Sequence, residues 1–230
     1  KRLALAGAPH GTLVLAGQQS AGRGRMGRRF ESPAGKGIYL SLVLRAPVPA
    51  SEALGVTVGA AVAVARAVQK LCGIELGIKW VNDLYYQGKK VCGMLLEMNA
   101  DEQSVHDVVA GIGINVHQTA FEGQIAKTAS SLDLLTGRRI CRADVVRAFL
   151  EEYEAVDELA RQDGEALMAV YRRHSATLGQ RVQVISATGS FTGTAKAVTD
   201  SGSLIVLDDD GREREVLAAD VSVRGLMGYA

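Results

Sequence analysis

The stretches KVCGMLLEM (residues 90–98) and VVAGIGINV (residues 108–116) decide the fold. Both are short runs of β-branched residues or leucine, and three similar runs precede them: TLVLAG at 12–17, GIYLSLVLR at 37–45 and IELGIKW at 74–80. Gly-rich or polar turns separate the runs, which is typical of strands joined by turns. Because a helical stretch at 51–72 interrupts them, they predict an α+β fold, in which a mixed, mostly antiparallel sheet packs on helices.

Helices are predicted in two regions of the chain. The uncharged run Ala53–Ala65 is shorter than the roughly 20 apolar residues that cross a bilayer, so we interpret it as part of a buried core helix that begins at a Ser51 cap. From Arg142 to about Ser175 the apolar residues recur at helical spacing, and a second helix is expected after Asp163. Residues 124–135 are expected to form a loop that ends in a short turn.

The character of the chain changes after residue 178. Four or five short strands are predicted there, joined by tight turns such as TGS, TDSGS and DDDG, as in a small β-barrel. We therefore expect a large domain over residues 1–176 and a small barrel domain over residues 177–230.

The composition is typical of a soluble globular protein. Of the 230 residues, 47% are hydrophobic and 22% are charged. The 26 Lys and Arg residues against 25 Asp and Glu residues leave a net charge of +1, which argues against general nucleic-acid binding. Cys72, Cys92 and Cys141 show no spacing typical of zinc or redox sites, so we expect reduced thiols. We expect a cytoplasmic protein without a membrane segment, because no signal-peptide pattern is present.

Residues 18–29, QQSAGRGRMGRR, are the most informative segment for function. Three glycines and four arginines fall within eight residues, a combination that core packing does not require. Glycine lets a backbone approach a ligand, and arginine donates hydrogen bonds to phosphate and carboxylate oxygens. Alone, the segment could be a solvated basic turn or an RNA-binding arm. Because strand-like runs flank it and no aromatic residue precedes Phe30, we favour a loop that closes over an anionic small ligand.

Two further segments are ambiguous when each is taken alone. KWVNDL at 79–84 leads into KKVCG at 89–93 through a predicted hairpin turn at Gln87–Gly88, and its NDL triplet could be a simple Asx turn. Lys90 is either a snorkelling surface lysine or a partly buried lysine that needs an anionic partner. In GIGINV, residues 111–116, the alternating glycines leave a strand open to a flat group such as a purine.

Together, and in this order, QSAGRGRMGR, KWVNDL with KKVCGMLLE, and GIGINV resemble the biotin protein ligases, and the similarity extends over essentially the whole chain. The resemblance implies a class II synthetase-like catalytic domain and a C-terminal SH3-like barrel, which runs from GQRVQV to VSVRG. It also implies a reaction in two steps. Biotin and ATP form biotinyl-5'-AMP and pyrophosphate with Mg²⁺, and biotin then passes to a lysine of a biotin carboxyl carrier domain, as in acetyl-CoA carboxylase. A homodimer is expected from related bacterial enzymes.

The resemblance also implies roles for individual residues. The implied catalytic residues are Arg23, Arg25, Asp83 and Lys90. The implied biotin-binding residues are Gln19, Arg23, Gly24, Arg25, Trp80, Lys90 and Gly93. The implied nucleotide-binding residues are Arg25, Arg28, Asn82, Lys90, Gly113 and Asn115. Asp83 is in addition a candidate to bind the metal or to orient the carrier lysine, and Arg28 is expected to close the loop.

The chain departs from the family pattern at three places. The family's Ser/Thr-Thr-Asn segment, which holds the ureido ring of biotin, belongs upstream of Lys1. Val81 stands where proline is usual, and Met26 where arginine is common. Two alternatives remain: a lipoate or octanoate ligase or transferase of the same fold, and a bifunctional biotin-operon repressor whose DNA-binding domain precedes this chain.

Overall fold

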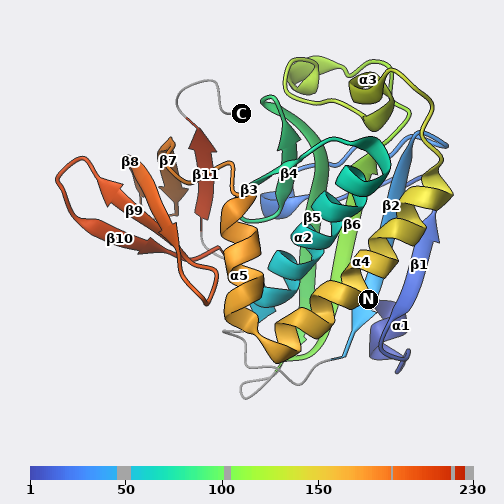
Figure 1. Cartoon of the computed structure of the whole chain (residues 1–230), viewed down its shortest axis with the longest axis horizontal. Helices are drawn as coiled ribbons and strands as arrows, with labels where there is room; N and C mark the ends of the chain where they lie inside the picture. Colours follow the sequence, from blue (N-terminus) through green and yellow to red (C-terminus); the bar gives the residue numbers. More distant parts are fainter. Residues whose placement is uncertain (46–52, 101–104, 188, 219–220, 226–230) are drawn as a thin grey trace.

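The larger of two sheets forms the centre of the molecule (Figure 1). The computed structural model describes residues 1–45, 53–100, 105–187, 189–218 and 221–225. The six strands of this sheet follow the order β1-β2-β6-β5-β4-β3, and neighbouring strands are antiparallel. They are β1 (Thr12–Ala16), β2 (Gly37–Leu44), β3 (Gly77–Lys79), β4 (Asp83–Tyr86), β5 (Lys89–Ala100) and β6 (Val105–Asn115). The predicted α+β fold with a mostly antiparallel sheet is confirmed.

Helices cover one face of this sheet (Figure 1). Helix α2 (Ala53–Cys72) packs between the sheet and helix α4 (Arg142–Gln162), and side chains such as Val58 and Val62 are fully buried. Within the described residues, α2 is the one helix long and apolar enough to cross a membrane by length and composition. Its burial against sheet and helix agrees with the predicted core helix. The predicted cap Ser51 lies outside the described residues.

The helix predicted after Asp163 is present, but one predicted loop is partly helical. Helix α5 (Gly164–Arg173) begins where the Asp163 carboxylate accepts a hydrogen bond from the Ala166 N–H at 2.9 Å. In the region predicted as a loop over 124–135, helix α3 (Leu132–Thr136) begins at a Ser131 cap, so this prediction was wrong in its last residues. A single helical turn is too short to show an apolar period. The remaining short elements are α1 (Arg2–Leu5), η1 (Arg25–Gly27) and η2 (Gly123–Ile125).

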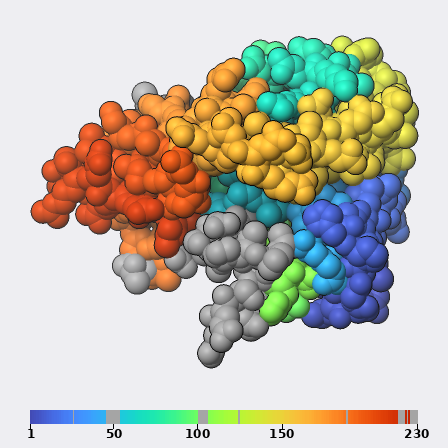
Figure 2. Space-filling view, turned by 60° about the horizontal axis from the view of Figure 1, so that its bottom comes forward, coloured from blue at the N-terminus to red at the C-terminus, as the bar shows by residue number. Residues whose placement is uncertain are grey.

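The C-terminal strands form a second antiparallel sheet of five strands in the order β10-β9-β8-β7-β11, in agreement with the predicted four or five strands. They are β7 (Arg181–Ser186), β8 (Gly189–Val198), β9 (Leu204–Asp208), β10 (Glu213–Val216) and β11 (Val221–Gly225). Figure 2 shows these strands, in orange and red, at one end of the molecule beside the helices. Arg172 of α5 joins the two parts by donating from Nε to the Val198 carbonyl at 2.7 Å. The division at residues 176 and 177 stays a prediction.

Candidate active site

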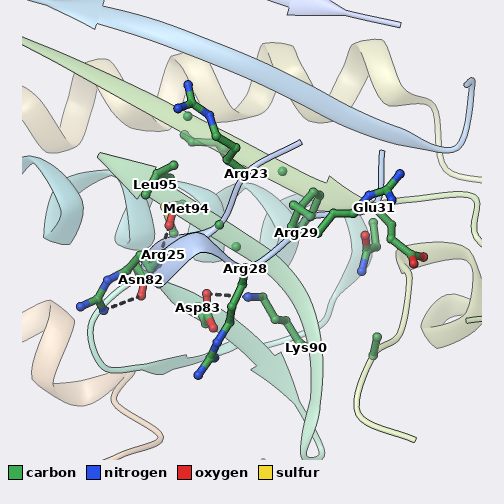
Figure 3. Close-up of a pocket in the computed structure, with 18 of the residues that line it drawn as sticks. Arg23, Arg25, Arg28, Arg29, Glu31, Asn82, Asp83, Lys90, Met94 and Leu95 are labelled. Carbon is green, nitrogen blue, oxygen red and sulfur yellow. Dashed lines mark hydrogen bonds and ion pairs between the residues drawn. The ribbon is translucent and has the colours of Figure 1, made fainter. Parts of the chain in front are cut away.

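One cavity of about 1320 Å³ is lined by every residue for which the resemblance implied a role in catalysis or binding. It lies against the large sheet, under the loop at residues 19–31, and its central residues are shown in Figure 3. The predicted site residues that line it are Gln19, Arg23, Gly24, Arg25, Arg28, Trp80, Asn82, Asp83, Lys90, Gly93, Gly113 and Asn115. Pockets that bind one small ligand have volumes of roughly 300–1,000 Å³, so this larger cavity has room for two small molecules.

An ion pair over glycine forms the charged centre of the cavity. Lys90 Nζ lies 2.7 Å from Asp83 Oδ1, and both side chains are partly exposed (Figure 3). The register of β4 and β5 places Asp83 opposite Gly93. A Cβ atom on Gly93 would lie 2.8 Å from Lys90 Nζ, which is closer than carbon and nitrogen can pack. The glycine therefore leaves the space in which the lysine reaches the carboxylate.

A tight hairpin turn produces this register. Gln87 and Gly88 both have positive φ angles, of 49° and 78°, as the commonest two-residue hairpin turns require. Asn82, just before β4, is fixed as well, because its side-chain amide donates to the Met94 carbonyl on β5. The predicted turn at Gln87–Gly88 is thus confirmed, and NDL is more than an isolated turn, because its Asn82 and Asp83 both face the cavity.

The loop at residues 19–31, called here the Arg-Gly loop, is folded back on itself. The Gln19 N–H donates to the Ser32 carbonyl at 3.1 Å, and Ser32 Oγ donates to Gln19 Oε1 at 2.7 Å. A Cβ atom on Gly22 would lie 2.3 Å from the backbone oxygen of Phe30, so any larger residue would force the two sides of the loop apart. Gly22 is therefore the glycine that this close approach requires, although only Gly24 was singled out from the sequence.

Arg25 ties the loop to two distant parts of the chain. Its guanidinium donates to Asn82 Oδ1 at 3.3 Å (Figure 3) and to the Ala218 carbonyl in the C-terminal part. Burial lowers the pKa of the Arg25 guanidinium; the carboxylate of Asp83 opposes this shift and the charge of Arg28 adds to it. A half-buried arginine remains a cation at neutral pH, because its ordinary pKa is above 12. Arg25 therefore places a positive charge close enough to interact with Asp83 of the ion pair.

Two further features complete the cavity near the loop. Arg23, which is mostly exposed, lies 3.6 Å from Glu97 Oε1, and Lys1 lies 2.9 Å from the same oxygen. On the sheet, the ring of Phe30 covers Gly113, where an added Cβ atom would lie 2.5 Å from the ring. Gly113 thus admits a flat ring, which in this structure is the side chain of Phe30. The approach of a purine to these glycines stays a prediction.

A cluster of hydrogen-bonded polar residues lies at the end of β6, and of its two amide side chains only Asn115 was predicted from the sequence. Asn115 donates from Nδ2 to the Ser130 carbonyl at 3.1 Å, and Gln118 donates from Nε2 to Asn115 Oδ1 at 3.1 Å. Lys90 is held beside this cluster, because its N–H donates to the Thr128 carbonyl at 2.7 Å. Gln118 was missed, since a glutamine just beyond a strand has no pattern that marks it.

Trp80 contacts both the cavity and the C-terminal sheet. Its side chain is buried, and its indole N–H donates to the Gly202 carbonyl at 2.9 Å. With the N–H occupied, the ring of Trp80 is the part left for a ligand. Val81, which stands where proline is usual, is buried in the core.

The family is decided by comparison with known proteins. The model of the Biotin/lipoate A/B protein ligase family matches residues 1–115, and that of the Biotin protein ligase C terminal domain matches residues 177–224. The chain belongs to the biotin protein ligase family. The second match favours the biotin ligases over the lipoate ligases, which share the first.

Individual biotin protein ligases are similar over almost the whole chain. The bifunctional ligase/repressor BirA of Bacillus spizizenii is 35% identical over 94% of this chain and 67% of its own length. The biotin--[acetyl-CoA-carboxylase] ligase of Mycobacterium tuberculosis is 35% identical over 92% of this chain and 78% of its own length. A solved biotin protein ligase from Aquifex aeolicus, in complex with biotin and ATP, superposes with a TM-score of 0.85 at 28% identity, over 98% of this chain and 94% of that one.

Proposed function

We propose that this chain is a biotin protein ligase, which forms biotinyl-5'-AMP from biotin and ATP and then transfers biotin to a lysine of a biotin carboxyl carrier domain. The observation that carries the proposal is the gathering of Arg25 and Lys90 around Asp83 in a cavity with room for two small molecules. The Aquifex ligase, solved with biotin and ATP, has the same fold.

In the first step, a carboxylate oxygen of biotin attacks the α-phosphorus of ATP, and the bond to the departing pyrophosphate breaks. Two anions must approach each other, and negative charge builds up on the phosphate oxygens. Fixed positive charges at that point lower the barrier, because they are already oriented when the charge develops. Lys90 and Arg25 supply these charges, and we propose that Arg23 and Arg28 close the loop over the product.

In the second step, the amine of the carrier lysine attacks the carbonyl carbon of the mixed anhydride, and AMP leaves. The lysine must attack as the neutral amine, and it gives up one proton as the amide forms. A carboxylate can orient it by accepting a hydrogen bond from one of its N–H groups. Asp83 is the carboxylate at this point, 2.7 Å from Lys90. We propose that it positions the incoming lysine.

Mg²⁺ fits this site only when it binds together with the phosphates of the nucleotide. Among the described residues no group of three His, Cys, Asp or Glu side chains could hold a metal ion. Mg²⁺ commonly binds through one or two carboxylates together with substrate phosphates. Asp83 would supply one carboxylate oxygen, and the metal would neutralise phosphate charge.

The partner, the assembly and the location are part of the same proposal. The partner is the carrier domain of acetyl-CoA carboxylase or a related carboxylase. A homodimer would form through strand β1, an edge strand on which Leu15 is 56% exposed. The three cysteines are free thiols, which supports a cytoplasmic location. A repressor function would belong to a DNA-binding domain outside this chain.

Biotin-dependent exchange of labelled pyrophosphate into ATP with Mg²⁺ tests the first step, with lipoate as the competing acid. We expect exchange with biotin and none with lipoate. Exchange with lipoate alone would contradict the proposal. Labelling of a carboxyl carrier domain by biotin tests the second step, and a carrier whose lysine is replaced by arginine is the control.

A further inference from the structure

Trp80 is held at both ends by residues that follow α5 in the chain. Its backbone N–H donates to Thr177 Oγ1 at 2.8 Å, and its indole N–H donates to the Gly202 carbonyl at 2.9 Å. All three residues are buried, and Trp80 also lines the cavity. Because one hydrogen bond holds the backbone and the other holds the far edge of the ring, together they fix the orientation of the indole.

Gly202 belongs to the tight turn at residues 199–203, called the β8–β9 turn. Within it the Thr199 N–H donates to the Ser203 carbonyl, and the Gly202 N–H donates to the Thr199 carbonyl, both at 2.9 Å. The φ angle of Gly202 is 86°, which favours glycine. A Cβ atom at this position would lie 2.6 Å from Cδ2 of Leu54 in α2. The turn therefore fits against α2 because a glycine stands there.

Arg172 of α5 holds the same turn. Its Nε donates to the Val198 carbonyl at 2.7 Å, and its guanidinium pairs with the carboxylate of Asp200. Figure 1 shows β8 and β9 beside α5. Arg172 is not among the described residues that line the cavity, so any effect of this side chain on a ligand must be indirect.

The hydrogen bond to Gly202 decides where the ring of Trp80 lies. An indole N–H can only donate, and a buried donor that loses its acceptor is strongly unfavourable. If the turn moved away, the ring could regain a partner by turning into the cavity that it lines, where it would occupy space for a ligand. A docked turn therefore keeps the ring in the wall of the cavity.

We propose that the β8–β9 turn positions Trp80 for its ligand: the Gly202 carbonyl holds the indole in the wall, so the affinity for biotin depends on how the C-terminal sheet is docked. The inference rests on the proposed function, in which Trp80 contacts biotin, and it makes the turn a positioning element. ATP should be unaffected, because its phosphates are assigned to Lys90, which pairs with Asp83.

The fluorescence of Trp80 reports its position, because it is the single tryptophan among the 230 residues. Arg172→Met removes both contacts with the turn, and we expect the emission of this ligand-free variant to shift to longer wavelength, as for an indole in contact with water. Equilibrium dialysis with labelled biotin should give a Kd about fivefold higher, the usual net effect of one hydrogen bond. The KM for ATP and the adenylation rate at saturating biotin should stay unchanged. Arg173→Met, at the exposed neighbour on α5, is the matched control.

A double-variant comparison separates positioning from a general effect on the fold. Trp80→Phe keeps an aromatic ring in the wall but removes the N–H that Gly202 accepts, so it should itself raise the Kd for biotin. Adding Arg172→Met to it should raise this Kd no further, because the turn then has no donor to hold. Asp200→Ala removes a carboxylate that is 73% exposed and should shift the emission in the same direction, which keeps the inference testable if urea unfolding shows that Arg172→Met does not fold.

Several results would overturn the inference. They are an unchanged Trp80 emission in both Arg172→Met and Asp200→Ala, an unchanged Kd for biotin in the folded variants, a KM for ATP that rises by the same factor, or a second fivefold rise in Kd when Arg172→Met is added to Trp80→Phe. Absence of biotin-dependent pyrophosphate exchange by the unaltered protein would instead remove the proposed function. The emission of the ligand-free variants would then still decide whether the turn positions Trp80.

Discussion

Replacing Lys90 by methionine should separate catalysis from stability. The ion pair with Asp83 lies at 2.7 Å, but its side chains are 30% and 24% exposed, so solvent screens it. Pairs of this kind contribute up to about 1 kcal/mol to folding, and the methylenes of methionine replace most of the lysine packing. The free energy of unfolding in urea should therefore fall by about 1 kcal/mol or less. Adenylation should suffer far more, because fixed groups at a developing anion are commonly worth 10²–10³-fold in rate, or roughly 3–4 kcal/mol.

The assay is single-turnover formation of biotinyl-5'-AMP, run beside urea unfolding. Lys89→Met is the matched control, because Lys89 is the exposed neighbour on the same strand and should keep the adenylation rate. Transfer from synthetic biotinyl-5'-AMP to the carrier should be less affected in Lys90→Met, since that step needs no pyrophosphate departure. A wild-type adenylation rate in Lys90→Met would refute the reasoning and leave Lys90 as a partner of Asp83 only.

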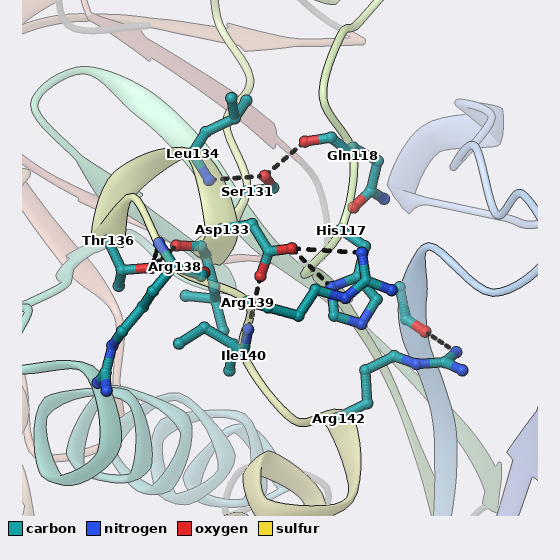
Figure 4. Close-up of polar contacts among 12 residues, drawn as sticks. His117, Gln118, Ser131, Asp133, Leu134, Thr136, Arg138, Arg139, Ile140 and Arg142 are labelled. Carbon is teal, nitrogen blue, oxygen red and sulfur yellow. Dashed lines mark hydrogen bonds and ion pairs between the residues drawn. The ribbon is translucent and has the colours of Figure 1, made fainter.

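Three further variants test other parts of the structure. Arg25→Ala, which removes the contacts that hold the loop closed, should fold normally and release biotinyl-5'-AMP several-fold faster; unchanged release by rapid filtration would exclude a covering role. Asp133 is partly buried, which opposes its ionisation, but hydrogen bonds from the Ile140 N–H and from His117 (Figure 4) outweigh this effect and lower its pKa. The stabilisation that these contacts give is therefore present above the unfolded pKa, near 4, and disappears as the pH falls through the lower pKa of the folded state. Asp133→Asn should therefore be less stable than the unaltered protein at pH 7 and differ little from it near pH 2, and a constant difference in urea unfolding at both pH values would contradict this. Asp163→Ala removes the cap of α5 and should cost about 1 kcal/mol in urea unfolding without changing adenylation; a full loss of activity would show that the cap does more than stabilise the helix.

Features that depend on neighbours in the chain could be predicted from the sequence. Asp163 and the apolar period after it predicted α5, and Gln87–Gly88 between two apolar runs predicted the β4–β5 hairpin. The Arg-Gly composition of residues 22–29 predicted a loop at a ligand site; residues of this loop line the cavity, and its ligand stays a prediction. Local rules sufficed here, because capping, turn geometry and periodicity involve residues only a few positions apart.

Features that depend on distant partners could not be predicted in this way. Whether Lys90 was a surface lysine or part of a site depended on the register that places Asp83 opposite Gly93. Helix α3 was missed because a single turn carries no period. Gln118 was missed because its place in the cluster depends on an asparagine whose own orientation is set by a carbonyl fifteen residues further along the chain.

By itself, the sequence therefore determined most of the elements, the charge of the loop and the resemblance to a family of ligases. Only the tertiary structure decided which of these groups face each other. It brought residues 19–31, 80–93 and 113–118 into one cavity and set an arginine between the NDL segment and the C-terminal part. The physical reason is that pairing across a sheet and burial are long-range. They give Lys90 its carboxylate and, among the described residues, leave the Gln118 oxygen without a donor. Neither can be read from a residue and its immediate neighbours.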